Sequence, residues 1–397
     1  MQLLKLSLIH VTDTILNQMD KGNYTGIIFL DLQKAFDTVD HGILLEKLGL
    51  YGIEGSEHMW FKSYLLDRKQ AVYVNGCFSD ILPICCGVPQ GSILGPLLFT
   101  LYMNDLPDFP KSCTTVLYAD DTALLYSNHD ISKIKQVLNH DLDIVSKLLF
   151  TNRLTLNVDK TKCLLFGSSY KLRNASPLDL EIDGNKIEQV ETFKYIGVWL
   201  DSKLDFSTHI TKIAAKISSK LYMTNSISKY LSIQHRKLLF NALVLPHFDY
   251  CSAIWSNTTN SNLETLVKLF KRAGRMLLGV PRCTPTSEVL ASLGWTTLHD
   301  RWKYYKCSIL FNVLHTKTPS YLYEKFTFSR QNHRYPSRHA TSNGLMLPKV
   351  RSNFGKRMFH FDACLEWNSL SDTTRQATTK LAFNRLCMKD IEKKKYQ

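Results

Sequence analysis

Two adjacent acids, Asp120 and Asp121, stand between two apolar runs of the kind that form strands. Residues 115–117 precede them and residues 123–126 follow them. Apolar runs joined by a short polar break predict a tight β-hairpin with both acids at its tip. Neighbouring carboxylates repel one another, and proteins tolerate them when they are fully hydrated or share a cation. Because the flanking runs have the composition of buried strands, the sequence favours a shared cation.

A third acid, Asp31, fits the same site. It follows residues 26–30, an apolar run typical of a central strand, and a sheet can bring it beside Asp120 although the two are far apart in the chain. Two Mg²⁺ ions roughly 3.5–4 Å apart, held by carboxylates and substrate phosphates, carry out nucleotidyl transfer. We therefore predict that Asp31, Asp120 and Asp121 are catalytic metal ligands for two Mg²⁺ ions, which Mn²⁺ can replace. For any one of the three, a surface acid is the alternative.

Five segments resemble the motifs of reverse transcriptases and occur in the order that this family has. They are FLDLQKAFDTVDH at 29–41 for motif A, GVPQGSILGP at 87–96 for motif B, YADD at 118–121 for motif C, NVDKT at 157–161 for motif D and FKYIG at 193–197 for motif E. The variants are similar to those of non-LTR retrotransposons of the LINE type, jockey-like ones in particular. The resemblance covers roughly residues 8–200, and more loosely the rest.

This resemblance implies an RNA-directed DNA polymerase that works by two-metal nucleotidyl transfer. Its implied partners are an RNA template, a DNA primer and deoxynucleoside triphosphates. One alternative is an RNA-dependent RNA polymerase, and the bulk of Phe36 argues against it because that class needs room for a 2′-hydroxyl. The other alternative is a catalytically inactive nucleic-acid-binding fragment or a domesticated remnant. The family's earlier fingers motifs do not occur in this sequence, so we expect an N-terminally truncated copy of an element.

The resemblance also implies roles for further residues. Phe36 is the implied steric gate under the incoming sugar, with a core aromatic as the alternative. Gln90 and Gly91 of motif B are implied to contact the nucleotide or template, although glycines there also suit a plain turn. Tyr118 is implied to pack near the primer or nucleotide, unless it is an ordinary strand tyrosine. Lys160 matches a catalytic general acid for pyrophosphate, and a solvated lysine is an equal alternative.

Charge is divided unequally along the 397 residues, which carry a net charge of +14. Residues 1–200 contain 18 Lys+Arg and 23 Asp+Glu, whereas residues 201–397 contain 31 and 12. This division suits a protein that holds metal in one part and a nucleic-acid backbone in the other. Beyond motif E, two segments have helical periodicity, and each has a basic face of its own. Taken alone, each segment also fits an ordinary amphipathic helix. The residues predicted to bind nucleic acid are Lys212, Lys216 and Lys220 in the first and Lys268, Lys271, Arg272 and Arg275 in the second.

The order of the periodic segments predicts an α+β fold. Interleaved helices and strands up to about residue 200 indicate a polymerase palm, an antiparallel sheet with flanking helices. A helical pattern beyond about residue 205 indicates a thumb and a C-terminal helical region. The expected domains are a remnant of the fingers at 1–22, the palm at 23–204, the thumb at 205–280 and a basic C-terminal region at 281–397. Residues 282–287 and 329–348 are expected to be loops because Pro, Ser, Thr, Arg and His are frequent there.

The cysteines and the apolar runs bear on the compartment. The ten cysteines are scattered without a Cys-x-x-Cys pair, which argues against a zinc ribbon or a redox pair. This favours a reduced intracellular protein, nuclear or cytoplasmic. No run reaches about 18 uncharged apolar residues, so we expect no membrane partner. Nothing in the pattern sets an oligomeric state.

Overall fold

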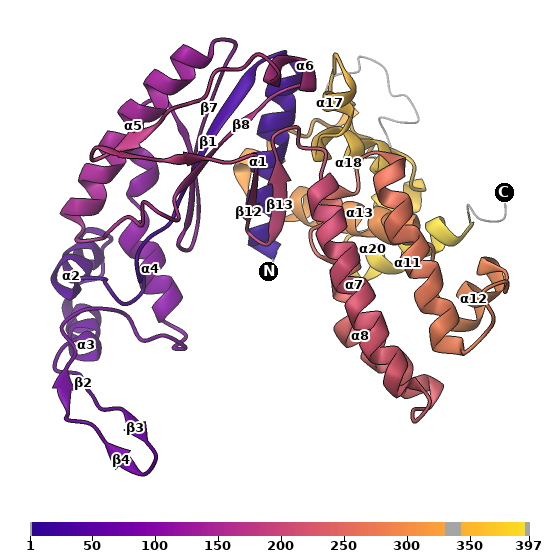
Figure 1. The fold of residues 1–397 in the computed structure, drawn as a ribbon, viewed down its shortest axis with the longest axis horizontal. Helices are drawn as coiled ribbons and strands as arrows, with labels where there is room; N and C mark the ends of the chain where they lie inside the picture. The colour runs from indigo at the N-terminus through magenta and orange to yellow at the C-terminus, as the bar shows by residue number, and fades with distance from the viewer. Residues whose placement is uncertain (1, 330–342, 394–397) are drawn as a thin grey trace. The chain divides into compact units, whose positions relative to one another are not determined.

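The chain divides into two units, which are drawn together in Figure 1 and described separately below. A computed structural model describes residues 2–329 and 343–393. One unit is Asn23–Tyr195, and the other combines Met1–Gly22 with Ile196–Gln397. Residues 1–22, predicted as a remnant of the fingers, therefore group with the C-terminal part of the chain. The division near the predicted palm–thumb boundary falls after residue 195, earlier than the expected 204.

A five-stranded sheet forms the centre of the Asn23–Tyr195 unit, in the order β11-β8-β1-β7-β6 (Figure 1). Central strand β1 runs antiparallel to β7 and β8, β6 runs antiparallel to β7, and only β11 pairs in parallel. The largely antiparallel palm sheet that the sequence predicts is thus confirmed. The strand bounds are β1 Tyr24–Leu30, β6 Thr114–Tyr118, β7 Asp121–Asn128, β8 Lys162–Phe166 and β11 Glu188–Gln189.

Strand β1 is covered on both faces. On one face lies helix α5 (Ile131–Thr151), and a Cβ added to Gly26 would come within 2.7 Å of Ile134 and of Leu138, so glycine permits this close approach. On the opposite face Phe29 stacks on Phe193 of β12 (Thr192–Tyr195), with ring centroids 4.3 Å apart. Alternate residues of a strand point to opposite faces, so an apolar run such as 26–30 suits this doubly buried position.

The other helices of this unit are α2 His41–Leu50, α3 Gly55–Leu65, α4 Gly95–Met103, the 3₁₀ turn Leu106–Asp108 and α6 Ser169–Leu172. The short strands are β2 Lys69–Gln70, β3 Tyr73–Val74, β4 Cys77–Phe78, β5 Leu82–Pro83, β9 Glu181–Ile182 and β10 Asn185–Lys186. The strands between 69 and 83 are only two residues long each. They are interrupted because β2 to β5 are exposed, and no buried face fixes a continuous register there.

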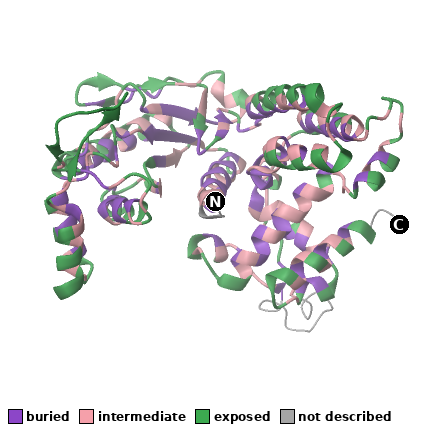
Figure 2. Cartoon of the chain, turned by 90° about the horizontal axis from the view of Figure 1, so that it is seen from below, coloured by how far each residue is buried: buried purple, intermediate pink, exposed green. Residues whose placement is uncertain are grey.

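The second unit is largely helical, as predicted for the region beyond about residue 205. Its thumb-like part contains β13 Val198–Asp201, α7 Ser207–Ser228, α8 Ile233–Leu243, α9 Leu245–Asp249, α10 Ser252–Trp255 and α11 Asn260–Leu278. The remaining helices are α1 Gln2–Asp20, α12 Thr286–Leu293, α13 Leu298–Thr316, α14 Ser320–Tyr323, α17 Asn353–Lys356, α18 Phe359–Asn368, α19 Asp372–Arg375 and α20 Lys380–Lys393. Many of these helices have one buried and one exposed side (Figure 2).

Two details of this unit bear on the sequence predictions. The loop expected at 282–287 ends early, because α12 begins at Thr286 after Pro285. The loop expected at 329–348 lies mostly outside the described residues, since 330–342 are not among them. None of the helices in the described ranges is long and apolar enough to cross a membrane.

Two aspartates of α1 explain why the first residues group with the C-terminal part. Asp13 accepts hydrogen bonds from the backbone N–H groups of Phe359 (2.7 Å) and His360 (3.0 Å), at the start of α18. Asp20 accepts one from the N–H of Ser352 (2.6 Å), which precedes α17, and one from the Ser352 hydroxyl (2.7 Å). The first N–H groups of a helix have no partner within the helix, so each carboxylate stabilises a helix start.

We predict that Asp20→Ala lowers the free energy of unfolding by about 1–2 kcal/mol, because it leaves these N–H donors without an acceptor. Asp20→Asn keeps one acceptor oxygen and should cost less. Urea unfolding of the full chain measures both, with Asp143→Ala as the control, since Asp143 is an exposed residue of α5. Equal unfolding curves for Asp20→Ala and Asp143→Ala would contradict the role assigned to Asp20.

Candidate active site

The hairpin between β6 and β7 holds the two adjacent acids. Tyr118 at the end of β6 pairs with Asp121 at the start of β7, so Ala119 and Asp120 form a two-residue turn. Ala119 has a φ of 53°, the left-handed conformation that two-residue hairpin turns favour. The predicted hairpin is confirmed, with Asp120 in the turn and Asp121 in the first pair of the ladder.

Strand β1 brings the third acid to the same end of the sheet. In the antiparallel pair of β1 and β7, Leu30 lies opposite Thr122. The next position along β1 is Asp31, and the next position along β7 in the opposite direction is Asp121. Continuing the register therefore sets Asp31 beside Asp121, while Asp120 follows in the turn. Asp31 is half-buried, and the two hairpin acids are exposed.

The three carboxylates affect one another's ionisation. Burial, together with the negative charges of Asp120 and Asp31, raises the pKa of Asp121 from 3.8 to about 6. A pKa near 6 means that the ionised carboxylate is disfavoured beside two other acids, which is the situation that a bound cation reverses.

The donor set suits a hard divalent cation, although its side chains do not close around one point. Within the described residues, no three His, Cys, Asp or Glu side chains are grouped tightly enough to hold an ion. Carboxylate oxygens are the ligands that Mg²⁺ and Mn²⁺ prefer, and Mg²⁺ usually takes only one or two of them together with substrate phosphates. Asp31, Asp120 and Asp121 therefore fit such an ion chemically.

A buried hydroxyl next to this group was not expected from the sequence. Tyr195 of β12 is 1% exposed, its hydroxyl has no hydrogen-bond partner among the described residues, and its ring lies 5.0 Å from that of Phe29. Burial raises the pKa of Tyr195, and the charge of Asp121 raises it further. The only signal for Tyr195 in the sequence is its place within FKYIG, the segment similar to motif E.

The segment similar to motif D holds the backbone of Asp31 in place. The Asp31 N–H donates to the hydroxyl of Thr161 (3.3 Å), and the Asp31 carbonyl accepts from the N–H of Asn157 (2.7 Å). Thr161 is fully buried and also donates to the Asn157 carbonyl (2.8 Å). Sequence reasoning singled out Lys160 in this segment. Lys160 is exposed, and its backbone N–H donates to the Asn157 side chain (3.3 Å).

The segment similar to motif B is tied to the residues that follow Asp31. The Gln90 side-chain amide donates to the carboxylate of Asp37 (2.8 Å), and His41 Nε2 donates to the carbonyl of Gly87 (2.8 Å). Gly87 has a φ of +89°, and a Cβ there would lie 2.8 Å from the Asp37 carbonyl oxygen. Through these contacts Asp37 and His41 hold the turn that follows Asp31. Gly91 has a φ of +84° and open space around it.

Phe36 and Tyr118 are both partly buried near these segments. The ring of Phe36 stacks on Phe99 of α4, with centroids 4.6 Å apart, and it packs against the main apolar core of this unit. A core contact of this kind is the alternative that the sequence left open for Phe36. The same contact holds the ring near the place where Gly87 packs against the Asp37 backbone.

A cavity of about 770 Å³ lies beside the segment similar to motif B. Gln90 and the backbone of Gly87 contribute to its wall, and Lys34 and Arg68 supply positive charge. Arg68 was not singled out from the sequence, because it lies between predicted elements and outside every recognised motif. A cavity with two cationic side chains suits a phosphate-bearing ligand.

The basic residues of α7 lie on one side of that helix. The Lys212 ammonium is 5.2 Å from the centroid of the Trp199 ring. Burial lowers the pKa of His247, and the positive charges of Lys216 and Lys220 lower it further. Lys212 and Lys216 are exposed and Lys220 is half-buried, so this face remains open to a polyanion.

The basic residues of α11 divide into exposed and internal ones. Lys268 and Arg272 are exposed, and Lys271 is half-buried. Arg275 is used internally: its guanidinium donates two hydrogen bonds to the Thr284 carbonyl (3.0 and 2.9 Å) and one to the Thr286 hydroxyl (3.1 Å). The predicted nucleic-acid contact of Arg275 thus competes with a role in holding the start of α12.

Comparison with known proteins agrees with this geometry. Residues 3–200 match the family described as reverse transcriptase (RNA-dependent DNA polymerase). The chain is 29% identical over 290 residues to a probable RNA-directed DNA polymerase from transposon BS of Drosophila melanogaster, covering 68% of this chain and 31% of that protein. It is 28% identical over 302 residues to the RNA-directed DNA polymerase from mobile element jockey of the same organism, covering 73% and 32%. The chain thus spans about a third of the length of these relatives.

Solved structures are more distantly similar. A telomerase from Candida albicans in complex with a fragment of telomeric RNA aligns with 81% of this chain and 57% of its own, at 13% identity and a TM-score of 0.35.

We predict that Asp120→Asn lowers the pKa of Asp121 from about 6, because it removes one of the two neighbouring negative charges. Asp31→Asn should act in the same direction. The raised pKa means that Asp121 favours folding most below its unfolded-state pKa near 4, and that this contribution is lost as the pH rises through about 6. Carboxyl ¹³C NMR titration measures the pKa, with Asp143→Asn as the control. An unchanged Asp121 titration in both site variants would contradict the proximity of the three acids.

Proposed function

Because this chain belongs to the reverse transcriptase (RNA-dependent DNA polymerase) family, we propose that it contains the polymerase centre of a LINE-type retrotransposon and extends a DNA primer along an RNA template. One observation carries the proposal. The register of β1 against β7 sets Asp31 beside Asp121, within the residues that match the family. A merely structural sheet has no need for three acids at one strand end, where they repel one another.

Asp31, Asp120 and Asp121 are proposed to hold two Mg²⁺ or Mn²⁺ ions. Such ions, when bound, lower the pKa of the primer's 3′-hydroxyl and neutralise charge on the leaving pyrophosphate. The chain's own part is to hold the ligands at fixed positions. Thr161 and Asn157 fix the backbone of Asp31, and the two-residue turn fixes Asp120 relative to Asp121.

The incoming deoxynucleoside triphosphate is proposed to bind beside the segment similar to motif B. The cavity there has Gln90 in its wall and Lys34 and Arg68 as cationic groups for the phosphates. Gly91 leaves the backbone open for close approach, and Phe36 is proposed to limit the space at the sugar. Tyr118 directly precedes the two-residue turn that contains Asp120, and it is proposed to contact the primer end or the nucleotide. Lys160 is proposed to give a proton to the leaving pyrophosphate.

The template and primer backbones are proposed to lie along the basic helices of the second unit. Lys212, Lys216 and Lys220 of α7 form one contact face. Lys268, Lys271 and Arg272 of α11 form another, with Arg275 behind them. Lysine and arginine side chains that neutralise phosphates give affinity without sequence preference, which suits a polymerase.

We predict that Asp31→Asn, Asp120→Asn and Asp121→Asn each reduce Mg²⁺-dependent DNA extension by at least about a hundredfold, because each removes a charged ligand where charge stabilisation dominates. Extension of oligo(dT) on poly(rA) measures this, with Asp143→Asn as the control. Affinity for the primer–template in the absence of Mg²⁺ should change little. Activity in all three variants equal to the control would contradict the proposed site. A wild-type chain that binds the primer–template but never extends it would favour nucleic-acid binding without catalysis.

We further predict that Phe36→Val raises the incorporation of UTP relative to dTTP by about tenfold or more, since a smaller side chain leaves room for the 2′-hydroxyl. The stacking on Phe99 is also lost, so the matched control is Phe99→Leu, which weakens the same stack from its other side. The two variants are compared for UTP and dTTP use in the extension assay. If both change sugar selectivity equally, or neither does, Phe36 acts through the core and not as a gate.

A further inference from the structure

The hydroxyl of Tyr195 is a buried donor that the described part of the chain leaves unpaired. Tyr195 is the last residue of β12 and is 1% exposed, and its hydroxyl has no hydrogen-bond partner among residues 2–329 and 343–393. An unpaired buried donor costs the free energy of removing it from water, without the return of a protein hydrogen bond. A bound ion or a catalytic role is a common reason for such a group in a folded protein.

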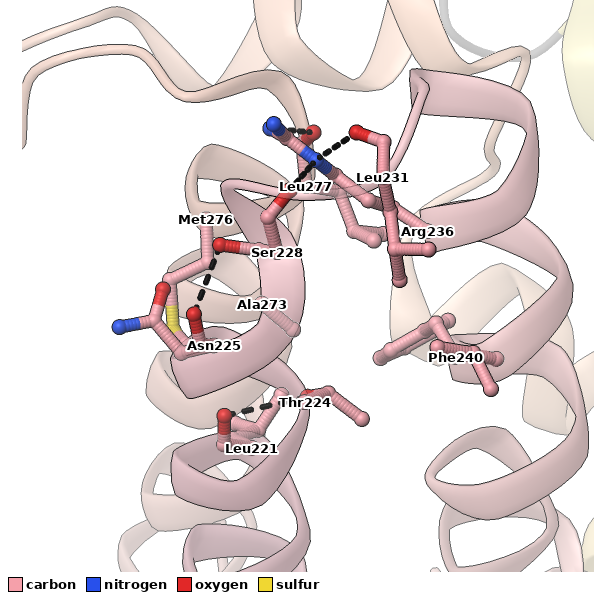
Figure 3. Close-up of a pocket in the computed structure, with 11 residues that line it drawn as sticks. Leu221, Thr224, Asn225, Ser228, Leu231, Arg236, Phe240, Ala273, Met276 and Leu277 are labelled. Atoms are coloured by element: carbon pink, nitrogen blue, oxygen red, sulfur yellow. Dashed lines mark hydrogen bonds between the residues drawn. The ribbon is translucent and has the colours of Figure 1, made fainter.

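Most buried polar groups in proteins do have partners. Figure 3 shows an example in the largely helical unit, a small apolar cavity among α7, α8 and α11. There the Thr224 hydroxyl donates to the carbonyl of Leu221 (3.1 Å), and Arg236 Nε donates to the carbonyl of Leu231 (3.0 Å). The cavity has a volume of about 20 Å³, which is room for one water molecule and for no larger ligand. Tyr195 differs, because its donor is unpaired and it packs on the sheet that carries the three acids.

The pleat of the sheet places Asp31 and Asp121 on the face that Tyr195 covers, since alternate residues of a strand point to the same face. Phe29 of β1 points to β12, where its ring lies 5.0 Å from that of Tyr195, and Asp31 comes two residues later. On β7, Ala123 pairs with Phe29, and Asp121 comes two residues earlier. Two residues of a strand cover only roughly 7 Å, so a side chain packed on Phe29 lies close to both acids.

The electrostatics agree with this placement. Burial raises the pKa of the Tyr195 phenol, and the charge of Asp121 raises it further, so these two side chains act on one another. The phenol therefore remains protonated at neutral pH and can donate to an ionised carboxylate. A carboxylate has about four acceptor sites on its two oxygens, so Asp121 can accept one hydrogen bond and still offer an oxygen to a cation.

We propose that Tyr195 is a positioning residue for the cation site, whose hydroxyl donates a hydrogen bond to the Asp121 carboxylate and holds it in the orientation that binds a divalent cation. This inference rests on the proposed function, because it concerns the same site. Folding leaves the hydroxyl without an acceptor, so pairing it upon cation binding gains free energy that adds to the affinity. Hydrogen bonds to the ligands of a metal generally strengthen its binding in this way.

Two tyrosine variants test this role. Tyr195→Phe removes the hydroxyl and keeps the ring that packs on Phe29. The matched control is Tyr24→Phe, at the end of β1 that is remote from Asp31, because the Tyr24 hydroxyl is paired and donates to the carbonyl of Lys171 (3.1 Å). Mn²⁺ is titrated into the full chain without substrate and followed by electron paramagnetic resonance. Urea unfolding in the absence of metal measures the stability of the same proteins.

The two variants should behave in opposite ways. Tyr195→Phe should weaken Mn²⁺ binding by about tenfold. Its urea midpoint should equal or exceed that of the wild type, because an unpaired buried donor is removed. Tyr24→Phe should keep the wild-type Mn²⁺ affinity and have a lower urea midpoint, because a paired donor is removed. In DNA extension, Tyr195→Phe should need about tenfold more Mg²⁺ for the half-maximal rate, and saturating Mg²⁺ should restore most of that rate.

Wild-type Mn²⁺ affinity in Tyr195→Phe would overturn the inference and leave the proposed function standing. A urea midpoint lowered as far as that of Tyr24→Phe would also overturn it, because the hydroxyl would then have a partner within the fold. An extension rate that no Mg²⁺ concentration restores would assign Tyr195 to the substrate or the fold rather than to Asp121. A wild-type chain without tight Mn²⁺ binding would overturn the proposed function, and this inference with it.

Discussion

The antiparallel pairing of β1 with β7 is the constraint on which the rest of the candidate active site depends. Strand β1 is buried between α5 on one face and Phe193 on the other, and β8 pairs with its second edge. A one-residue slip would turn its apolar residues to the wrong faces, so burial fixes the register. Since the register is fixed, so is the position of Asp31 relative to the hairpin that carries Asp120 and Asp121.

Electrostatic repulsion opposes this arrangement, and the surrounding residues limit how far it can yield. The backbone of Asp31 is held from the 155–161 segment through Thr161 and Asn157. Asp120 is confined to a two-residue turn. The acids therefore keep their places in the chain and can adjust only by side-chain rotation. We propose that a multivalent cation relieves this repulsion, because carboxylate oxygens are its preferred ligands.

Local pattern was enough to predict some parts of this structure and not others. The hairpin and the basic α7 and α11 follow from apolar periodicity, which depends on neighbouring residues only. Apolar periodicity did not predict the hydrogen bond from the Asp31 N–H to the Thr161 hydroxyl. This bond joins residues that lie 130 positions apart in the chain. Nor did periodicity predict the grouping of residues 1–22 with the C-terminal part, which depends on Asp13 and Asp20 meeting helix starts more than 330 residues away. The strand-end position of Asp31 allowed it to lie beside Asp120, and the motif resemblance supported that long-range link.

Phe36 and Arg275 show a further limit of reasoning from residue type. Each was given a ligand-binding role, and each also has a definite internal contact, with Phe99 and with Thr284. Which neighbours a side chain meets is decided by packing between distant elements, and sequence spacing does not specify it.

The central claim is that Asp31 joins Asp120 and Asp121 in one cation site. Electron paramagnetic resonance of Mn²⁺ titrated into the full chain tests it without substrate or activity, because free and protein-bound Mn²⁺ give different signals. The account predicts that Asp31→Asn abolishes the tight binding seen with the wild-type chain, even though both hairpin acids remain. Mn²⁺ binding by Asp31→Asn that equals the wild type would show that the strand register does not create the site.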